Sequence, residues 1–146
     1  MTTVTKTVKF DAAHVLPNHG GLCRNLHGHT YRVDVTAACA DDAGRDMVID
    51  FQDIKKIAAE TICERFDHTF IYDAGSAVER EIAAVLERNG MRTAPVGFRT
   101  TAENLARYFY ETLQPRIPCI SAVRVLETAD NAAEYRSAGG GRVSAG

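Results

Sequence analysis

Hydrophobic and polar residues alternate near the start of the chain, which is the pattern of a strand with one buried face. Within residues 3–11, the apolar positions of that face are Val4, Val8 and Phe10. The alternation returns from about residue 28 to residue 40, and an apolar segment follows at residues 47–49. The pattern predicts a first strand at 3–11 and an antiparallel hairpin formed by 28–40 and 47–49.

Three later segments show the spacing of amphipathic helices. The first follows Asp50, which can cap a helix, and extends to Phe66. The second spans about residues 76–90, and the third begins near Thr100 or Thr101 and ends before residue 115. We expect a short strand at 93–98 between the last two helices.

The second helix has a defined start, face and end. Ser76 is followed three residues later by Glu79, the spacing of a capping box. Gly90 ends the segment, because glycine favours the backbone conformation found beyond a helix C-terminus. The apolar stripe expected to face the core consists of Val78, Ile82, Val85 and Leu86.

A final strand is expected at residues 121–128, where Val123, Val125 and Glu127 share one face. Strands, helices and a closing strand predict a single α+β domain over residues 1–136. The glycine-rich segment 137–146 is expected to form a flexible tail. A sheet with so few strands has open edges, and oligomerisation is one common way to cover them.

Composition narrows the class of protein. The chain has 146 residues, with 17 basic and 19 acidic side chains, so its near-neutral charge argues against nucleic-acid binding. Its apolar runs are too short to cross a bilayer, and its start lacks an apolar signal-peptide core. The four cysteines form no CxxC pair, which favours free thiols in a reducing compartment. We therefore expect a cytoplasmic protein.

Three histidines form a candidate metal site. His27 and His29 are two residues apart on a predicted strand, so both side chains lie on one face. His14 ends the preceding strand and would lie beside them. Three neutral imidazoles suit Zn²⁺ and leave a fourth position for substrate or water, as in catalytic zinc sites. The alternative is a chance His-x-His pair without a metal.

Other candidate residues admit more than one interpretation. Cys23 precedes His27 by four residues, and its thiol is either a catalytic base, an inert thiol or a fourth zinc ligand. Asp67 can orient His68 for proton transfer, or His68 can simply interact with a helix C-terminus.

Two glutamates add a possible binding function. Glu127 shares the face of buried valines, where a carboxylate needs a partner. A ligand with a guanidine-like edge would supply two parallel N–H donors, whereas the alternative is an exposed edge-strand glutamate. For Glu103, the structural alternative is a helix-capping box, because it follows Thr100 by three residues.

Taken together, these residues resemble the 6-pyruvoyltetrahydropterin synthase family, and more closely its 6-carboxytetrahydropterin synthase branch. The spacing Cys-x-x-x-His-Gly-His favours that branch. The segments that carry the resemblance, in the family's order, are 10–14 (FDAAH), 23–31 (CRNLHGHTY), 47–51 (MVIDF), 66–68 (FDH), 101–106 (TAENLA) and 123–128 (VRVLET).

The resemblance implies a tunnelling-fold (T-fold) subunit, with a four-stranded antiparallel sheet and helices on one face. Such subunits join edge to edge into a barrel, usually a hexamer of two trimers with active sites at the interfaces. By position, His14, His27 and His29 would bind Zn²⁺, and the proton relay would consist of Cys23, Asp67 and His68. Glu127 would anchor the 2-amino-pyrimidine edge of a pterin, with Thr101 and Glu103 near the same pocket.

The implied activity is that of a zinc-dependent lyase. It would convert 7,8-dihydroneopterin triphosphate to 6-carboxy-5,6,7,8-tetrahydropterin, acetaldehyde and triphosphate, for 7-deazaguanine (queuosine-type) synthesis. The alternatives are a pyruvoyl-type or related pterin side-chain enzyme and, more remotely, a non-catalytic zinc-stabilised binding module. Three features depart from the family pattern, namely Thr100, Tyr72 and the long segment 73–99. We expect them to affect the local pocket wall and the loop beside His68, and not the zinc site.

Overall fold

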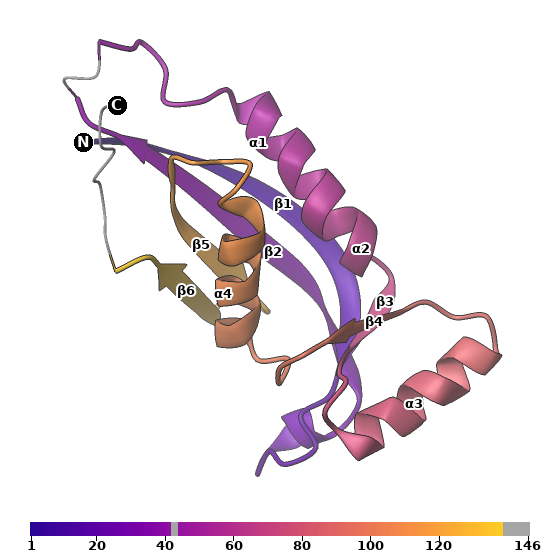
Figure 1. The fold of residues 1–146 in the computed structure, drawn as a ribbon. Coiled ribbons are helices and arrows are strands. Elements are labelled where there is room, and N and C mark those ends of the chain that lie inside the picture. Colours follow the sequence, from indigo (N-terminus) through magenta and orange to yellow (C-terminus); the bar gives the residue numbers. More distant parts are fainter. Residues whose placement is uncertain (42–43, 139–146) are drawn as a thin grey trace.

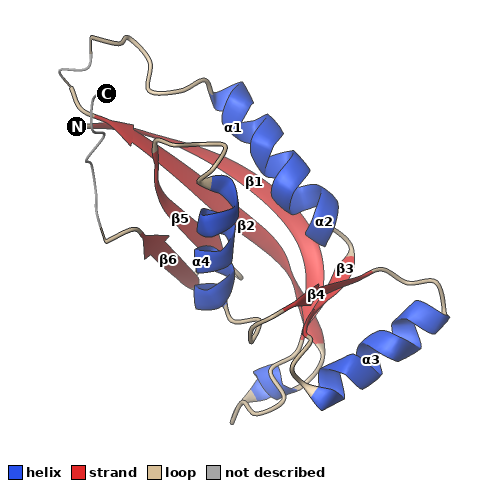
Figure 2. Ribbon diagram, in the orientation of Figure 1, coloured by secondary structure: helices blue, strands red, loops and turns tan. Residues whose placement is uncertain are grey.

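Two thirteen-residue strands form the centre of the fold. β1 (Thr2–His14) and β2 (His27–Cys39) pair antiparallel along their whole length, with Thr2 opposite Cys39 and His14 opposite His27. The computed structural model describes residues 1–41 and 44–138. The long hairpin curves through the molecule and carries the remaining strands on its two sides (Figures 1 and 2).

The sheet has six strands in the order β4-β3-β1-β2-β5-β6. The added strands are β3 (Thr69–Asp73), β4 (Thr93–Val96), β5 (Ile120–Leu126) and β6 (Ala132–Arg136). The sequence predicts four antiparallel strands, whereas the sheet has six, so the predicted number of strands is wrong. Strands β1, β2, β5 and β6 are antiparallel neighbours, whereas β3 and β4 extend the sheet by parallel pairing beyond β1.

The predicted hairpin return at residues 47–49 is also wrong. This segment forms no strand, because β2 already pairs with β1 on one edge and β5 on the other. Val48 and Ile49 instead pack against the main core as part of the connection to the first helix.

The first helical segment is continuous from residue 51 to residue 66, as predicted. It consists of α1 (Phe51–Ala58), a π-helical turn η2 (Ala59–Cys63) and the short α2 (Glu64–Phe66). Asp50 caps its start, and its carboxylate accepts a hydrogen bond from the Gln52 backbone N–H at 2.8 Å. A π-turn changes the direction in which the following residues point, and here it is followed by α2, whose C-cap is Asp67.

The Asp50→Ala variant should lose about 1 kcal/mol of folding stability, because the N-terminal amide of the helix loses its acceptor. Urea unfolding should reveal this loss, with an unchanged slope against denaturant. Gln52→Ala is the matched control, since it keeps the backbone donor and the cap. Equal stabilities of the two variants would contradict a capping role for Asp50.

Helices α1, α2 and α4 (Ala102–Leu113) cover one face of the sheet, called here the inner face. Helix α4 lies against β5 and β6, and α1 lies along β1 (Figure 1). The inner-face core includes fully buried Tyr31, Phe66, Phe109, Val33 and Val125.

The helix α3 (Ala77–Arg88) departs from the expected one-sided packing. It packs with Phe70 and Ala13, whose side chains alternate away from the inner face, in a small second core. Figure 1 shows α3 beside β3 and β4, apart from the other helices. The expectation that all helices share one face is therefore wrong for α3.

The predicted stripe of α3 is only half correct. Ile82 and Leu86 pack against the second core, but Val78 and Val85 are 52% and 49% exposed. Glu79 takes a buried position instead, because its carboxylate accepts the Asp73 backbone N–H at 3.1 Å. The Ser76 cap is confirmed, with its hydroxyl accepting the Glu79 N–H at 3.4 Å.

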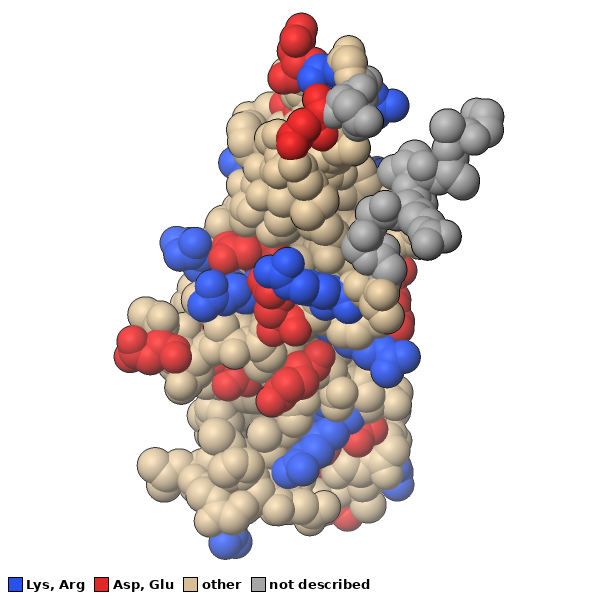
Figure 3. Space-filling model, turned by 90° about the vertical axis from the view of Figure 1, so that its left-hand side faces the viewer, with Lys and Arg blue, Asp and Glu red and all other residues tan. Residues whose placement is uncertain are grey.

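Acidic and basic side chains intermingle on the face drawn in Figure 3. None of the described helices has the length and apolar character to cross a membrane. Strand β6 ends at Arg136, and most of the expected tail, 139–146, lies outside the described residues.

Candidate metal centre and active site

The three candidate metal ligands meet at one end of the β1–β2 hairpin. His14 ends β1 opposite His27, which begins β2, and His29 follows two residues later. Alternation places all three side chains on the inner face, continuing the row of Phe10 and Tyr31. The structure therefore brings together the histidines that the sequence predicts.

Hydrogen bonds fix the orientation of two of these rings. His14 donates from Nδ1 to the Thr100 carbonyl at 2.9 Å, and His27 donates from Nδ1 to the Asn25 carbonyl at 2.7 Å. A carbonyl oxygen only accepts, so both neutral rings carry their proton on Nδ1. Their Nε2 atoms consequently present lone pairs to the site.

The Nε2 atoms of all three rings converge, and those of His14 and His27 face each other without a proton to share. His14 Nε2 lies 3.0 Å from His27 Nε2 and 3.1 Å from His29 Nε2. Two unprotonated nitrogens at this distance repel each other unless a cation lies between them. Tetrahedral zinc with Zn–N bonds of about 2.0–2.1 Å separates its nitrogens by about 3.3 Å. The donor set therefore fits a divalent metal ion.

Thr100 is a site residue that the sequence analysis misassigned. The cap of α4 is Thr101, whose hydroxyl accepts the Asn104 N–H at 3.3 Å, so the predicted Thr100–Glu103 capping box is wrong. Thr100 is instead fully buried, with its carbonyl bonded to His14. Orienting a metal-ligand ring through its second nitrogen is common in metal sites. No local pattern indicates a contact across 86 residues.

Burial favours the neutral form of His14 and His29. It lowers the pKa of His14 to about 4, an effect that the Thr100 carbonyl opposes and the neighbouring His27 and His29 reinforce. The pKa of His29 is also lowered, first by burial and then by His27. Neutral imidazole is the form that binds a metal.

The metal-free protein should lose stability as the pH falls from about 6.5 towards 4. The unfolded His14 binds a proton in this range and the folded one does not, so unfolding is favoured by up to about 3 kcal/mol. Urea titrations of chelator-treated protein at several pH values measure the loss, with His14→Gln as the comparison. A pH profile identical in the two proteins would contradict this assignment.

Glu127 lies beside the histidines, just beyond the end of β5. Its carboxylate oxygens are 3.9 Å from His14 Nε2 and from His29 Nε2. The prediction that Glu127 shares the face of the buried valines is confirmed. Burial raises the pKa of its carboxyl group, His27 opposes the shift, and Glu103 adds to it. Glu103 is therefore near enough to act on Glu127 from the exposed start of α4.

Cys23 is half-buried in the short helix η1 (Leu22–Arg24) of the connection between β1 and β2. Its thiol is not part of the group formed by His14, His27 and His29, whose ligand atoms lie within 4.8 Å of one another. This placement disfavours Cys23 as a fourth metal ligand. The charge of Cys23 adds to the rise in the pKa of Tyr31, whose ring contacts His14 and His29, so the thiol lies near the same site.

Asp67 and His68 lie on the opposite, outer face of the sheet. The Asp67 carboxylate accepts the Asp11 backbone N–H at 2.9 Å and is 3.0 Å from His68 Nδ1. These contacts, the Asp11 N–H first, lower the pKa of Asp67. The Asp11 side chain points outward, where Thr30 donates a hydrogen bond to it. The two are paired as predicted, and with Asp11 they form a group of possible ligand atoms separate from that of the three histidines.

The backbone of His68 is unusual. Its φ of 55° lies in the left-handed region, which a non-glycine residue enters at an energetic cost. Its N–H donates to the Asp11 carbonyl at 2.7 Å, and Arg92 binds the Asp67 carbonyl at 2.9 Å. His68 thus follows Asp67, the C-cap of the helical segment, with its side chain 74% exposed.

A shallow groove of about 660 Å³ surrounds His68 on the outer face. Polar residues and exposed apolar residues line it together, including Asp11, Arg92, Leu26 and Met91. Leu26 and Met91 are 55% and 57% exposed. The groove therefore combines a paired acid–base group with apolar surface.

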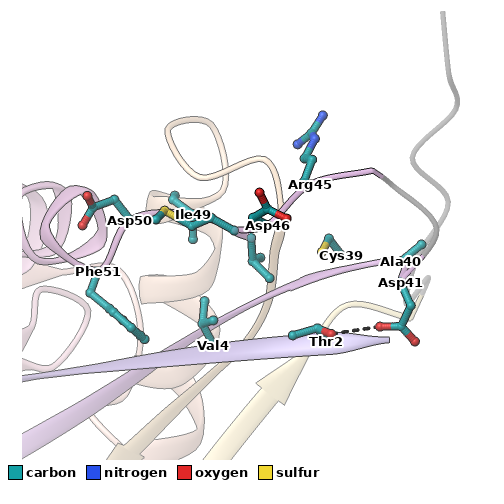
Figure 4. A pocket seen from close by; sticks show the side chains of 12 residues that line it. Thr2, Val4, Cys39, Ala40, Asp41, Arg45, Asp46, Ile49, Asp50 and Phe51 are labelled. Carbon is teal, nitrogen blue, oxygen red and sulfur yellow. Dashed lines mark hydrogen bonds between the residues drawn. The ribbon is translucent and has the colours of Figure 1, made fainter.

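A second pocket, of about 400 Å³, lies at the far end of the hairpin (Figure 4). Val4, Cys39 and the irregular segment 47–49 line it, and Thr2 donates a hydrogen bond to Asp41 there at 2.9 Å. It contains none of the predicted site residues.

The fold agrees with comparisons to known proteins. The family described as 6-pyruvoyl tetrahydropterin synthase matches residues 3–138, and the chain belongs to this family. A 6-carboxy-5,6,7,8-tetrahydropterin synthase of Haemophilus influenzae is 40% identical, over 93% of this chain and 99% of that protein. A protein of the same name from Aquifex aeolicus is 33% identical, over 91% and 96%.

Solved structures support the same fold. The 6-pyruvoyl tetrahydropterin synthase of Caenorhabditis elegans superposes with a TM-score of 0.69 over 94% of this chain and 96% of that one, at 23% identity. The 6-pyruvoyl tetrahydropterin synthase of Plasmodium falciparum gives a TM-score of 0.63 at 19% identity, over 94% and 99%. The resemblance in fold and family predicted from the sequence is confirmed.

Proposed function

We propose that this chain is a 6-carboxy-5,6,7,8-tetrahydropterin synthase. It would convert 7,8-dihydroneopterin triphosphate to 6-carboxytetrahydropterin with release of acetaldehyde and triphosphate. The observation that carries the proposal is the convergence of three imidazole Nε2 atoms beside Glu127. The named relatives at 40% and 33% identity support the choice of branch.

His14, His27 and His29 would hold a zinc ion. The ion would supply Lewis-acid polarisation of the hydroxyl oxygens on the substrate side chain. The carbonyls of Thr100 and Asn25 keep two of the rings oriented for this role, so little reorganisation accompanies binding.

Glu127 would bind the 2-amino-pyrimidine edge of the pterin. A carboxylate accepts two parallel N–H bonds from such an edge. Thr101 and Glu103, at the start of α4, would border the same pocket, and Thr101 also caps the helix. The proximity of Glu103 to Glu127, seen in its effect on the Glu127 pKa, supports a shared pocket.

Cys23 would act as the base that moves protons at the substrate side chain, and His68 oriented by Asp67 would complete the relay. Because Asp67 and His68 lie on the outer face, they would serve the histidine site of another copy. The apolar groove around His68 supports such an interface. We infer a homo-oligomer, a hexamer of two trimers, with its active sites between subunits.

We place the reaction in cytoplasmic 7-deazaguanine synthesis of the queuosine type. The substrate is a small pterin, and the chain itself would bind neither nucleic acid nor membrane. The mixed charge on the face in Figure 3 is consistent with a small-molecule enzyme.

Mass spectrometry of products tests the proposal directly. Zinc-loaded protein incubated with 7,8-dihydroneopterin triphosphate should form 6-carboxytetrahydropterin and acetaldehyde. The Cys23→Ala variant should retain its metal but form these products on the order of 10²- to 10⁴-fold more slowly. A pyruvoyl product would assign the chain to the sister activity, and unchanged substrate with intact zinc-bound protein would overturn the proposal.

A further inference from the structure

Tyr31 carries a buried hydroxyl that the protein does not satisfy. The side chain is fully buried, and its oxygen is the one buried side-chain N or O atom in residues 1–41 and 44–138 without a hydrogen-bond partner. Leaving a polar group buried and unpaired is costly, so such groups in native proteins call for an explanation.

The ring of Tyr31 is held firmly next to the metal centre. It stacks on Phe10 at a centroid distance of 5.1 Å and meets His29 edge-on at 5.3 Å and His14 at 5.9 Å. Contacts on both sides fix the ring, so its hydroxyl has a defined position. Tyrosine has few rotatable bonds, which makes it suitable for precise placement.

Glu127 lies across from Tyr31 on the neighbouring strand. Strands β2 and β5 pair Val33 with Val125 and Arg32 with Leu126, and one further step sets Tyr31 opposite Glu127 on the inner face. Directly opposed residues on one face of antiparallel strands are close neighbours. The charges of Glu127 and Cys23 add to burial in raising the Tyr31 pKa, which agrees with this placement.

The Tyr31 hydroxyl and the Glu127 carboxylate are a complementary donor and acceptor. Within the described part of the chain, no hydrogen bond reaches the Glu127 carboxylate, whose nearest cationic candidates are the histidine nitrogens at 3.9 Å. Tyr31 offers a donor without an acceptor, and Glu127 offers acceptors without a donor. A hydrogen bond to a carboxylate is stronger than one between neutral groups.

We propose that Tyr31 is a positioning residue whose hydroxyl donates a hydrogen bond to Glu127 in the ligand-bound site. One carboxylate oxygen is then held by Tyr31, and the carboxylate plane is aimed at the N–H edge of the bound pterin. This inference rests on the proposed function, in which Glu127 binds that edge. In this role the buried Tyr31 hydroxyl determines the orientation of the Glu127 carboxylate.

Binding of biopterin, a fluorescent pterin, to zinc-loaded protein tests this role. Tyr31→Phe keeps the ring and its packing, so metal content should be unchanged and thermal stability equal or higher. Its affinity for biopterin should fall about 10- to 100-fold, the range for a hydrogen bond to a charged group. Tyr135→Phe, on the edge strand β6, is the matched control and should bind normally.

A double-mutant comparison separates positioning from a general structural effect. In a Glu127→Gln background, Tyr31→Phe should weaken biopterin binding by less than 3-fold, because the charged acceptor is absent. If Tyr31→Phe binds biopterin as tightly as wild type while Glu127→Gln does not, the inference is overturned and the proposed function stands. If Glu127→Gln also binds normally, the proposed role of Glu127 fails as well.

Discussion

The His29→Ala variant should fold, lose its tightly bound zinc and lose activity on the order of 10³-fold. The imidazole contributes one of three converging Nε2 atoms, and removing it leaves two protein ligands for the ion. Loss of Lewis-acid stabilisation worth several kcal/mol accounts for a rate effect of this size. His29 is the suitable position, because His14 is almost completely buried and its replacement threatens folding.

Metal content per chain after gel filtration, together with product formation, measures this effect. His19→Ala is the matched control, since His19 is an exposed loop histidine whose side chain accepts the Gly21 backbone N–H at 2.8 Å. The control should keep both zinc and activity. A His29→Ala protein that retains one zinc per chain would disprove the assigned ligand set.

Two inactive variants, Cys23→Ala and His68→Ala, should restore activity when they are mixed and reassembled. Each variant alone should lose about 10²- to 10⁴-fold, the range for a general acid or base. Cys23 lies on the histidine side of the sheet, whereas His68 lies on the outer face beside Asp11. Each site would then take Cys23 from one copy and His68 from another. In a randomly reassembled one-to-one mixture, about a quarter of the sites would have both residues intact, so about a quarter of wild-type activity should return.

A second mixture provides the control. Asp67→Asn and His68→Ala alter the same half of the site, because their side chains are paired at 3.0 Å. Mixing them should therefore leave every site defective. Recovery in this control, or none in the first mixture, would contradict a site shared between copies.

Features controlled by local chemistry could be predicted from the sequence. The strand alternation around Phe10, the cap at Asp50 and the left-handed Gly90 at the end of α3 are each determined by neighbouring residues. The histidine cluster was also predictable, because a two-residue repeat on a strand fixes which side chains share a face.

Features that depend on distant partners were not predictable in this way. Strand β3 pairs in parallel with β1, and nothing near Thr69 indicates that partner. Thr100 fits a capping pattern in the sequence, but in the structure Thr101 caps the helix and the Thr100 carbonyl binds His14. The outward position of Asp67 depends on a hydrogen bond to Asp11, 56 residues earlier.

The pairing of His14 with His27 would link the proposed metal binding to the alignment of the hairpin. A slip of one residue between β1 and β2 would turn His27 and His29 to the outer face while His14 stayed inside. Only a correctly aligned hairpin can assemble the three nitrogens. An ion that binds during folding would therefore stabilise only the correct register of β1 and β2, the longest strand pair of the protein. Chains with a shifted register would fail to retain the ion and could be recognised by its absence.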